Sequence, residues 1–333
     1  MDLLNAFIVF ANFVLIPATS YGAQLALGAL GVTLIYGILR FSNFAHGDTM
    51  AFGAMVTILF TWWFQSLGLS LGPLPTALLA LPLGIAGCAA LLLATDRVVY
   101  RFYRAQKAKP VILVIVSMGV MFVLNGLVRF IIGVDDQRFA DGERFIISAR
   151  TFREMTGLEE GLAFRTSQGL TIVVAAIAVA ALFWFLNRTR TGKSMRAFSD
   201  NEDLALLSGI NPEKVVAVAW LITAALATTA GVLYGLDKSF KPFTYFQLLL
   251  PIFAAAIVGG LGNPLGAIAG GFIIAFSEVT FTYAFKRVFE YLGMEPEGLV
   301  QLLSTDYKFA VSFTILVIVL IYRPTGLFRG KAV

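Results

Sequence analysis

The sequence contains one cysteine, Cys88, and one histidine, His46, among 333 residues. A single cysteine excludes an internal disulfide and any metal site built from several cysteines. With only one histidine beside it, no zinc motif such as H-E-x-x-H can form. We therefore predict no enzyme of the metal or thiol type, no metal site and no cofactor bound by this chain. Cys88 lies in an apolar run, which is typical of a packing residue.

Charged residues are also scarce, at 14% of the chain, whereas 58% of the residues are hydrophobic. Soluble domains are about one quarter charged. A mean hydropathy of +0.83 means more apolar surface than a water-soluble fold can bury, so lipid is the expected solvent. We predict an all-α, polytopic membrane protein that forms a single transmembrane domain over residues 1–333. Membrane lipid is an expected partner and nucleic acid is not.

Long stretches without any Asp, Glu, Lys or Arg mark the expected spans, since about 20 residues cross the hydrocarbon core. They cover residues 20–39, 49–66, 74–95, 110–128, 169–187, 215–236, 242–277 and 309–322. The stretch 242–277 is too long for one crossing and is interrupted by GGLGNPLGAIAGG. We divide it into crossings 243–259 and 265–281 joined by a tight turn. The run 3–17 ends at Pro17 and is interpreted as an additional short membrane helix. About eight to nine transmembrane helices are predicted.

The charges that remain predict the orientation. With the C-terminus in the cytoplasm, the cytoplasmic side is net positive and the outer side net negative. Basic residues are also denser in the short cytoplasmic segments, as the positive-inside rule requires. The cytoplasmic segments are then the N-terminus, 40–48, 96–109, 188–214 and 323–333. The outer loop 134–167 is long and rich in acids. It is either a surface for a partner protein or a solvated loop.

One short connection on the predicted cytoplasmic side, FSNFAHGDTM at residues 41–50, is unusually polar. In one interpretation Ser42 or Asn43 caps the next helix, Asp48 lies in its first turn and His46 is a hydrogen-bonding fixture. In the other, Asn43, His46 and Asp48 make polar contacts at the inner mouth of a pathway. Asn125 is a further polar candidate within a span. Both interpretations are open at the level of sequence.

The segment 188–214 is too long for a plain turn between two spans. Apolar residues recur in it at helical spacing with charged residues between them. This pattern predicts one short amphipathic helix that ends at Gly209, with Asn211 beginning the next helix. Helices on a bilayer surface usually have a mainly basic polar face, so the acids of this segment favour docking onto a soluble protein. The predicted docking residues are Arg196, Asp200, Glu202, Asp203, Leu207, Ser208, Gly209 and Asn211.

The same segment contains TRTGKS, residues 189–194, which resembles part of a phosphate-binding loop. The full motif G-x-x-x-x-G-K-[ST] requires glycine where this chain has Asn187. We therefore predict no nucleotide binding by this chain. The predicted spans also lack Asp, Glu and His, the residues that commonly relay protons in carriers and pumps. For a transport protein, the driving energy would then arrive from outside the chain, through the docking segment.

The interrupted stretch 259–271 contains six glycines. Small residues let membrane helices approach closely, so helix packing is one interpretation. The other is a hinge or gate in which exposed backbone groups line a pathway. The candidates for this gate are Gly259, Gly260, Gly262, Asn263 and Pro264.

Four stretches together carry a family resemblance: YGILRFSNFAHGD at 36–48, RAFSDNEDLALLSGINPEKV at 196–215, IVGGLGNPLGAIAGG at 257–271 and YRPTGLF at 322–328. In this combination the sequence resembles the permease subunits of bacterial branched-chain amino acid ABC importers. The resemblance implies a location in the bacterial inner membrane. It also implies three kinds of partner: a second homologous permease subunit, two ATP-binding cassette ATPase subunits and an extracytoplasmic substrate-binding protein. The family's coupling helix corresponds to Arg196–Gly209.

The resemblance further implies the ABC importer permease fold and import of branched-chain or similar hydrophobic amino acids, driven by ATP hydrolysis in the partner subunits. Relatives also move other apolar amino acids or small amides such as urea, so the substrate stays open. The choice between homodimeric and heterodimeric pairing stays open as well. A stand-alone secondary transporter or channel is the main rival, and a membrane-embedded enzyme or scaffold is a third. Gradient-driven uptake by the purified chain alone would identify the protein as a secondary transporter.

Overall fold

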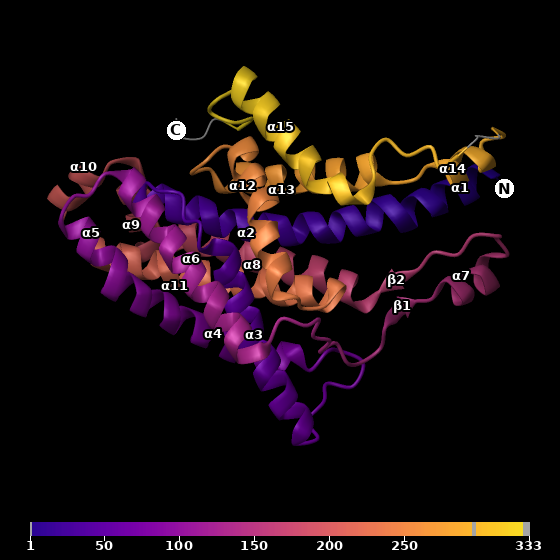
Figure 1. The fold of residues 1–333 in the computed structure, drawn as a ribbon, viewed down its shortest axis with the longest axis horizontal. Coiled ribbons are helices and arrows are strands. Elements are labelled where there is room, and N and C mark those ends of the chain that lie inside the picture. Colours follow the sequence, from indigo (N-terminus) through magenta and orange to yellow (C-terminus); the bar gives the residue numbers. More distant parts are fainter. Residues whose placement is uncertain (1, 295–297, 329–333) are drawn as a thin grey trace.

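The computed structural model describes residues 2–294 and 298–328, and this part of the chain is almost entirely helical (Figure 1). The longer helices are α2 (Ile16–Leu39), α3 (His46–Ser66), α4 (Ala77–Thr95), α6 (Pro110–Ile132), α8 (Thr166–Arg188), α11 (Pro212–Lys238), α12 (Pro242–Gly259), α13 (Pro264–Thr282) and α15 (Lys308–Tyr322). The shorter elements are α1 (Asp2–Phe10), α5 (Arg101–Ala105), α7 (Ala149–Thr156), α9 (Arg190–Asp200), α10 (Glu202–Leu207), α14 (Lys286–Tyr291), β1 (Phe145–Ile147) and β2 (Phe164–Arg165).

The molecule is elongated, and its short elements gather at two opposite ends (Figure 1). We call the end that carries α5, α9 and α10 the docking end. The end that carries the N-terminus, α1, α7, α14 and both strands is called the loop end. The helical body lies between these two ends, and α3 extends to a third corner at the bottom of the view (Figure 1). The docking segment and the long loop therefore lie at opposite ends of the helical body.

Eight helical segments among the described residues are long and apolar enough to cross a membrane. They include α6, α8 and α11 as single helices and α4 together with α5 as one segment, whereas α3, with 21 residues, is not among the eight. Strand structure in the described residues is limited to the short pair β1 and β2 and three isolated bridges. The prediction of an all-α, polytopic fold is therefore confirmed.

The N-terminal run belongs to the first span, so the prediction of a separate membrane helix over 3–17 is wrong. α1 and α2 join through a π-helical turn, Ala11–Leu15, and form one helix from Asp2 to Leu39. In this turn the Ile16 N–H donates to the carbonyl of Ala11. Pro17 has no N–H, and such local widening accommodates a proline inside a membrane helix.

Because this helix crosses once, the N-terminus and the end of α2 lie at opposite ends of the molecule. Asn12 Nδ2 donates to the carbonyl of Gly161 in the long loop at 2.6 Å, and the Ala163 N–H donates to Asn12 Oδ1 at 2.8 Å. The prediction that the N-terminus shares a side with the segment 40–48 is therefore wrong. The break expected at Pro17 does not exist, and this removes one crossing from the predicted topology.

α2 is the central helix of the fold. It packs against α11, α12, α13 and α8, and nearly all of its residues from Ser20 onward are buried. A helix that is apolar on all faces is expected in such a position. The contact with α13 is close: a Cβ on Gly271 would lie 2.7 Å from the backbone nitrogen of Ala26. Glycine at this position therefore lets the two helices approach.

The division of 242–277 into two crossings is confirmed. α12 ends at Gly259 and α13 begins at Pro264, with the turn 260–263 between them. Asn263 is the N-cap of α13, because its side chain accepts a hydrogen bond from the Gly266 N–H at 3.2 Å. Pro264 follows in the first helical position, which has no need of an N–H donor.

The long loop at the loop end is folded and tied to the N-terminal and C-terminal parts of the chain. β1 and β2 form an antiparallel pair. Glu160 Oε1 lies 2.8 Å from Arg287 Nη2 and accepts a hydrogen bond from the Tyr291 hydroxyl at 2.9 Å. Since Glu160 is buried, these contacts anchor the loop onto the α14 region.

Candidate functional site

The docking segment contains two helices, so the prediction of one amphipathic helix is wrong. α9 and α10 are separated at Asn201, whose backbone is extended (φ −151°, ψ 108°). The Asn201 side chain accepts a hydrogen bond from the Leu204 N–H at 3.0 Å and thereby caps α10. Asparagine side chains compete with the helical backbone in this way, which explains the break inside an otherwise helical pattern.

The apolar residues of the docking segment divide into an anchored set and an exposed set. Met195 and Phe198 of α9 and Ala205 of α10 are buried against the helical body. Leu204 and Leu207 of α10 are 61% and 84% exposed. The exposed leucines lie one helical turn apart, so they share a face of α10. Exposed leucines on an anchored helix form a surface suited to a protein partner.

The remaining docking residues surround this face. Glu202, Asp203 and Ser208 are exposed, so acidic and apolar side chains lie side by side on one short helix. We define the α10 surface as these three residues with Leu204 and Leu207. The acidic charge close to exposed leucines disfavours burial in an anionic leaflet and favours a protein groove.

The predicted end of the segment is confirmed. Gly209 has φ +79°, a conformation that favours glycine, and follows the last turn of α10. Asn211 caps α11, since its side chain accepts from the Lys214 N–H at 3.3 Å, and Pro212 follows in the first turn. The docking segment is thus held between two defined helix boundaries.

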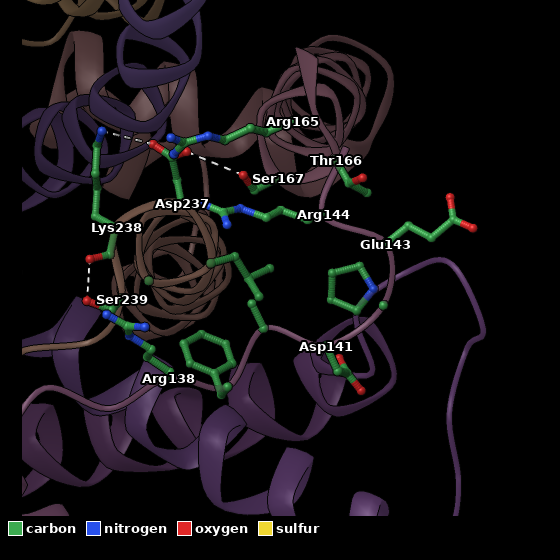
Figure 2. A pocket seen from close by; sticks show the side chains of 16 residues that line it. Arg138, Asp141, Glu143, Arg144, Arg165, Thr166, Ser167, Asp237, Lys238 and Ser239 are labelled. Carbon is green, nitrogen blue, oxygen red and sulfur yellow. Dashed lines mark hydrogen bonds and ion pairs between the residues drawn. The ribbon is translucent and has the colours of Figure 1, made fainter. Parts of the chain in front are cut away.

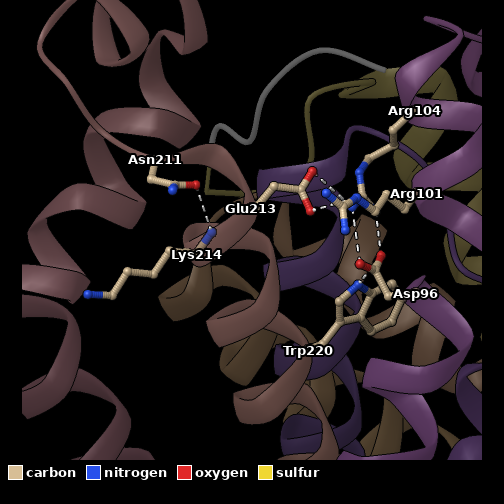
Figure 3. Close-up of polar contacts among 7 residues, drawn as sticks. All are labelled: Asp96, Arg101, Arg104, Asn211, Glu213, Lys214 and Trp220. Carbon is tan, nitrogen blue, oxygen red and sulfur yellow. Dashed lines mark hydrogen bonds and ion pairs between the residues drawn. The ribbon is translucent and has the colours of Figure 1, made fainter.

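Polar contacts brace the base of α11 at the docking end (Figure 3). The Arg104 guanidinium forms an ion pair with Asp96, and Asp96 Oδ1 also accepts from Trp220 Nε1 at 2.8 Å. Arg101 Nε lies 3.4 Å from Glu213 Oε2. The Arg101–Glu213 pair is half exposed and contributes little to stability. Asp96 and Trp220 are buried, so their hydrogen bond fixes α11 against the end of α4.

Two candidate sets that are far apart in sequence line one cavity of about 270 Å³ at the docking end. Arg196 and Asp200 belong to the docking segment, whereas Gly262, Asn263 and Pro264 belong to the turn between α12 and α13. The docking segment and the glycine-rich turn are therefore neighbours.

α9 is also bonded to the end of the central helix. The Arg40 guanidinium, immediately after α2, donates to the carbonyl of Ser199. Arg40 itself has φ +56° at the C-cap of α2. The docking segment thus contacts α2 as well as the α12–α13 turn.

The glycines of the turn permit very close backbone contact. A Cβ on Gly259 would lie 2.0 Å from the carbonyl oxygen of Gly266, and Gly260 and Gly262 have φ of +110° and +83°. The helix-packing interpretation of these glycines is thereby given a structural basis. The gate interpretation stays a prediction.

The C-terminal segment closes over this turn. The Leu327 N–H donates to the carbonyl of Val258 at 2.8 Å, and the Phe328 N–H donates to the carbonyl of Gly259 at 3.2 Å. Asn263 Nδ2 donates to the carbonyl of Phe328 at 2.9 Å. Two of the stretches that carry the family resemblance are therefore parts of one structural unit.

The polar residues of FSNFAHGDTM are buried, although a surface connection is expected from the sequence. Asn43, His46 and Asp48 are 2%, 0% and 1% exposed. Asn43 Oδ1 accepts from the Ala45 N–H at 3.1 Å, which forms a local turn, and the N-cap of α3 is Ala45. Asn43 is thus not the cap of α3. Asp48 lies in the first turn of α3, as predicted.

These residues do not form one cluster. Asn125 Nδ2 of α6 donates to Asp48 Oδ1 at 2.7 Å. His46 instead packs on α2, where a Cβ on Gly31 would lie 2.5 Å from its Cε1 atom. The structure therefore joins Asp48 and Asn125, and it places His46 in the interior of the chain as a tightly packed side chain.

A cavity of about 460 Å³ lies at the loop end (Figure 2). Four basic residues line it, namely Arg138, Arg144, Arg165 and Lys238. Asp237 lies on the same wall, where it accepts from the Ser167 hydroxyl at 3.3 Å and lies 3.6 Å from Lys238 Nζ. The cavity is thus a recess with basic and acidic side chains on its walls, and none of these residues is among the candidates predicted from the sequence.

Asp141 on the rim of this cavity is held in its ionised form. Burial opposes ionisation, but the Thr76 N–H and hydroxyl donate to its two oxygens at 2.7 Å and 2.5 Å. These bonds outweigh burial and hold the pKa of Asp141 below its ordinary value. They tie the long loop to the start of α4.

A family model described as branched-chain amino acid transport system / permease component matches residues 15–320. The chain belongs to this family. The family predicted from the four sequence stretches is thereby confirmed. As a permease component the chain is a transport subunit and not an enzyme.

Individual relatives match over nearly their whole length. The high-affinity branched-chain amino acid transport system permease protein LivH of Salmonella typhimurium is 30% identical over 92% of this chain and 91% of its own. The corresponding protein BraD of Pseudomonas aeruginosa is 28% identical over 94% of each chain. A probable LivH of Methanocaldococcus jannaschii is 29% identical over 84% of this chain and 83% of its own.

Among solved structures, PsaBC from Streptococcus pneumoniae in complex with Fab covers 98% of this chain and 93% of its own, with a TM-score of 0.45 and 13% identity. A metal-chelate type ABC transporter in an inward-facing conformation gives a TM-score of 0.47 and 16% identity. Both TM-scores are below 0.5, so the family assignment rests on the sequence matches.

The permease also contains buried acids in its long helices, so the prediction that the spans lack Asp, Glu and His is wrong. Glu278 of α13 is 2% exposed and accepts a hydrogen bond from the Ser312 hydroxyl of α15. His46 and Asp48 lie within α3. Glu278 lies outside the uncharged stretch 242–277 but inside the predicted crossing 265–281. Its position inside that crossing was the available signal for an acid within a span.

Proposed function

We propose that this permease carries branched-chain or similar hydrophobic amino acids inward across the bacterial inner membrane, in an ABC importer whose separate ATPase subunits dock on the α10 surface. The observation that carries the proposal is α10 itself. Leu204 and Leu207 are 61% and 84% exposed, while Met195, Phe198 and Ala205 anchor the segment below them. The permease relatives LivH and BraD, named for branched-chain amino acid transport, support the substrate class.

The mechanism we propose is a population shift between two orientations of the permease. ATP-dependent closure of the ATPases moves α9 and α10. α9 contacts the end of α2 through Arg40 and shares a cavity with the α12–α13 turn. The movement then shifts these helices together and favours the outward-facing state of the permease over the inward-facing state. ATP hydrolysis then restores the inward-facing state.

The assembly we propose contains a second homologous permease subunit, two ATPases and an extracytoplasmic substrate-binding protein. The docking end faces the cytoplasm together with the C-terminal segment, as the distribution of basic residues favours. The folded loop 134–167 then faces the binding protein.

The proposal is tested with the complete complex in proteoliposomes. We expect Leu207→Asp to lower ATP-driven L-leucine uptake at least about tenfold, because a charge at a central apolar contact commonly costs more than about 1–2 kcal/mol of binding. Copurification of the ATPases should fall in parallel, while membrane insertion is unchanged. The matched control is Leu69→Asp, because Leu69 is 49% exposed in the connection between α3 and α4.

Two results would contradict the proposal. Normal ATPase copurification and uptake by the Leu207→Asp complex would remove the docking role of α10. Uptake by the permease alone, driven by an ion gradient without ATP, would identify a secondary transporter instead.

A further inference from the structure

A cavity of about 250 Å³ lies between α2, α11, α13 and α15 near the loop end. Its apolar wall includes Phe13, Pro17 and Val279. The volume is slightly below the range of about 300–1,000 Å³ that holds drug-sized ligands. The cavity therefore suits a small molecule with one apolar group.

The cavity contains a buried carboxylate that the fold does not fully satisfy. Glu278 is 2% exposed, and Ser312 donates a hydrogen bond to its Oε1 atom. The Tyr21 hydroxyl lies beside this carboxylate and interacts with it, but neither that hydroxyl nor Glu278 Oε2 reaches full hydrogen-bond geometry with a described residue. Burying an acceptor without a donor is costly. A ligand with a cationic donor would remove that cost.

Positive charge lines the same cavity at a distance from the carboxylate. Lys308 interacts electrostatically with Glu278, but no ion pair within 4.0 Å joins these two described residues. Lys238 also lines the cavity, and its Nζ lies 3.6 Å from Asp237 Oδ2. An acid and two ammonium groups are thus held apart around one space, beside an apolar wall. This arrangement complements a zwitterion.

The cavity adjoins the outer recesses of the molecule. Lys238 lines the 460 Å³ cavity of Figure 2 and a second cavity of about 460 Å³ that includes Arg153 and Arg287. Phe13 and Pro17 line both this second cavity and the cavity at Glu278. The three cavities therefore neighbour one another, which provides a polar approach from the loop end.

We propose that this cavity is a binding site for the substrate amino acid within the permease, with the α-ammonium group on Glu278, the α-carboxylate toward Lys308 and Lys238, and the side chain against Phe13, Pro17 and Val279. This inference rests on the proposed function for its choice of an amino acid. An aminophospholipid headgroup shares the zwitterionic chemistry, and the test below separates the two sources.

The test measures occupancy without relying on transport. A Thr282→Cys variant places a thiol on the cavity wall, and the natural Cys88 is fully buried. The complete complex is reconstituted in phosphatidylcholine and phosphatidylglycerol vesicles, which contain no primary ammonium lipid, and is labelled with a membrane-impermeant maleimide. We expect L-leucine to slow labelling of the introduced thiol. The control Ser66→Cys lies at the exposed end of α3, away from the cavity, and should label at the same rate with and without leucine.

Charge requirements are tested in the same assay. 3-Methylbutylamine lacks the carboxylate and 4-methylpentanoate lacks the ammonium group, so each should protect at least about tenfold less effectively than leucine. Glu278→Gln should raise the leucine concentration for half-protection at least about tenfold, and Lys308→Gln should do the same. The matched control Glu290→Gln removes an exposed acid on α14 and should change nothing.

The outcomes separate the two proposals. Leucine uptake without protection of the introduced thiol, or equal protection by 4-methylpentanoate, overturns the binding site and leaves the proposed function standing. Protection without uptake supports the site and contradicts the transport proposal. Protection only by phosphatidylethanolamine vesicles identifies a lipid site and overturns the inference. Because protection is first measured with Glu278 intact, a folding defect of Glu278→Gln cannot decide the result.

Discussion

At the scale of single residues, the structure changes the meaning of His46. From sequence alone, a lone histidine beside Asn43 and Asp48 is either a hydrogen-bonding fixture or a polar contact at the mouth of a pathway. In the fold it is completely buried and fills the space left by Gly31, which has no side chain. The pairing of a large ring with a glycine makes both positions intolerant of added volume.

We predict that Gly31→Ala destabilises the permease by about 1–3 kcal/mol, because its Cβ would lie 2.5 Å from the His46 ring. The same change in a His46→Ala background should cost measurably less, since the ring is absent. Gly119→Ala is the control, because nothing lies within 4 Å of its Cβ position. Thermal unfolding in detergent is measured for Gly31→Ala, His46→Ala, the double variant and Gly119→Ala. Equal destabilisation by Gly31→Ala in both backgrounds would refute the contact.

At the scale of elements, the turn between α12 and α13 and the C-terminal segment act as one unit. Asn263 connects them: its side chain accepts from the Gly266 N–H and donates to the carbonyl of Phe328. One amide group thus caps a helix and fastens the chain terminus. Aspartate keeps the acceptor but removes the donor, which allows the two roles to be separated.

We predict that Asn263→Ala and Asn263→Asp both release the C-terminal segment, whereas only Asn263→Ala also weakens the start of α13. Hydrogen exchange at the amides of Leu327 and Phe328 should accelerate roughly 2–10-fold in both variants. Exchange at Gly266 should accelerate in the alanine variant alone, since an N-cap contributes about 0.5–2 kcal/mol. Unchanged exchange at Leu327 in both variants would show that Asn263 does not hold the segment.

At the scale of the whole molecule, the continuous helix from Asp2 to Leu39 decides at which end of the helical body the N-terminal part of the chain lies. It places the N-terminus with the long loop and opposite α9 and α10 (Figure 1). The start of this helix and the α9–α10 segment therefore lie at opposite ends of the helical body. This arrangement follows from one helix that does not break at Pro17.

We predict that an impermeant maleimide applied to intact spheroplasts labels Asp2→Cys and Ser66→Cys but does not label Ser208→Cys. Inside-out vesicles should give the reverse pattern. The natural Cys88 is buried and serves as the background. Labelling of Asp2→Cys and Ser208→Cys from the same side would mean that the N-terminal run crosses the membrane separately.

The sequence was sufficient for the features that depend on local chemistry. Scarcity of charge predicted the membrane helices, Gly209 and Asn211 predicted the boundaries of the docking segment, and the motif stretches predicted the family. The sequence was insufficient to predict the helix break at Asn201. An asparagine inside a helical pattern caps a new helix only when tertiary packing favours two helices over one.

The sequence by itself determined the solvent, the helical class and the family of this permease, because apolar content, helix-capping residues and motifs act along the chain. Only the tertiary structure decided that Asn43, His46 and Asp48 are buried, that the C-terminal segment closes over the turn 260–263, and that Glu278 faces a cavity with Lys308. These facts depend on contacts between helices that are distant in sequence. Such contacts are selected by packing of whole helices and leave no local periodic signal.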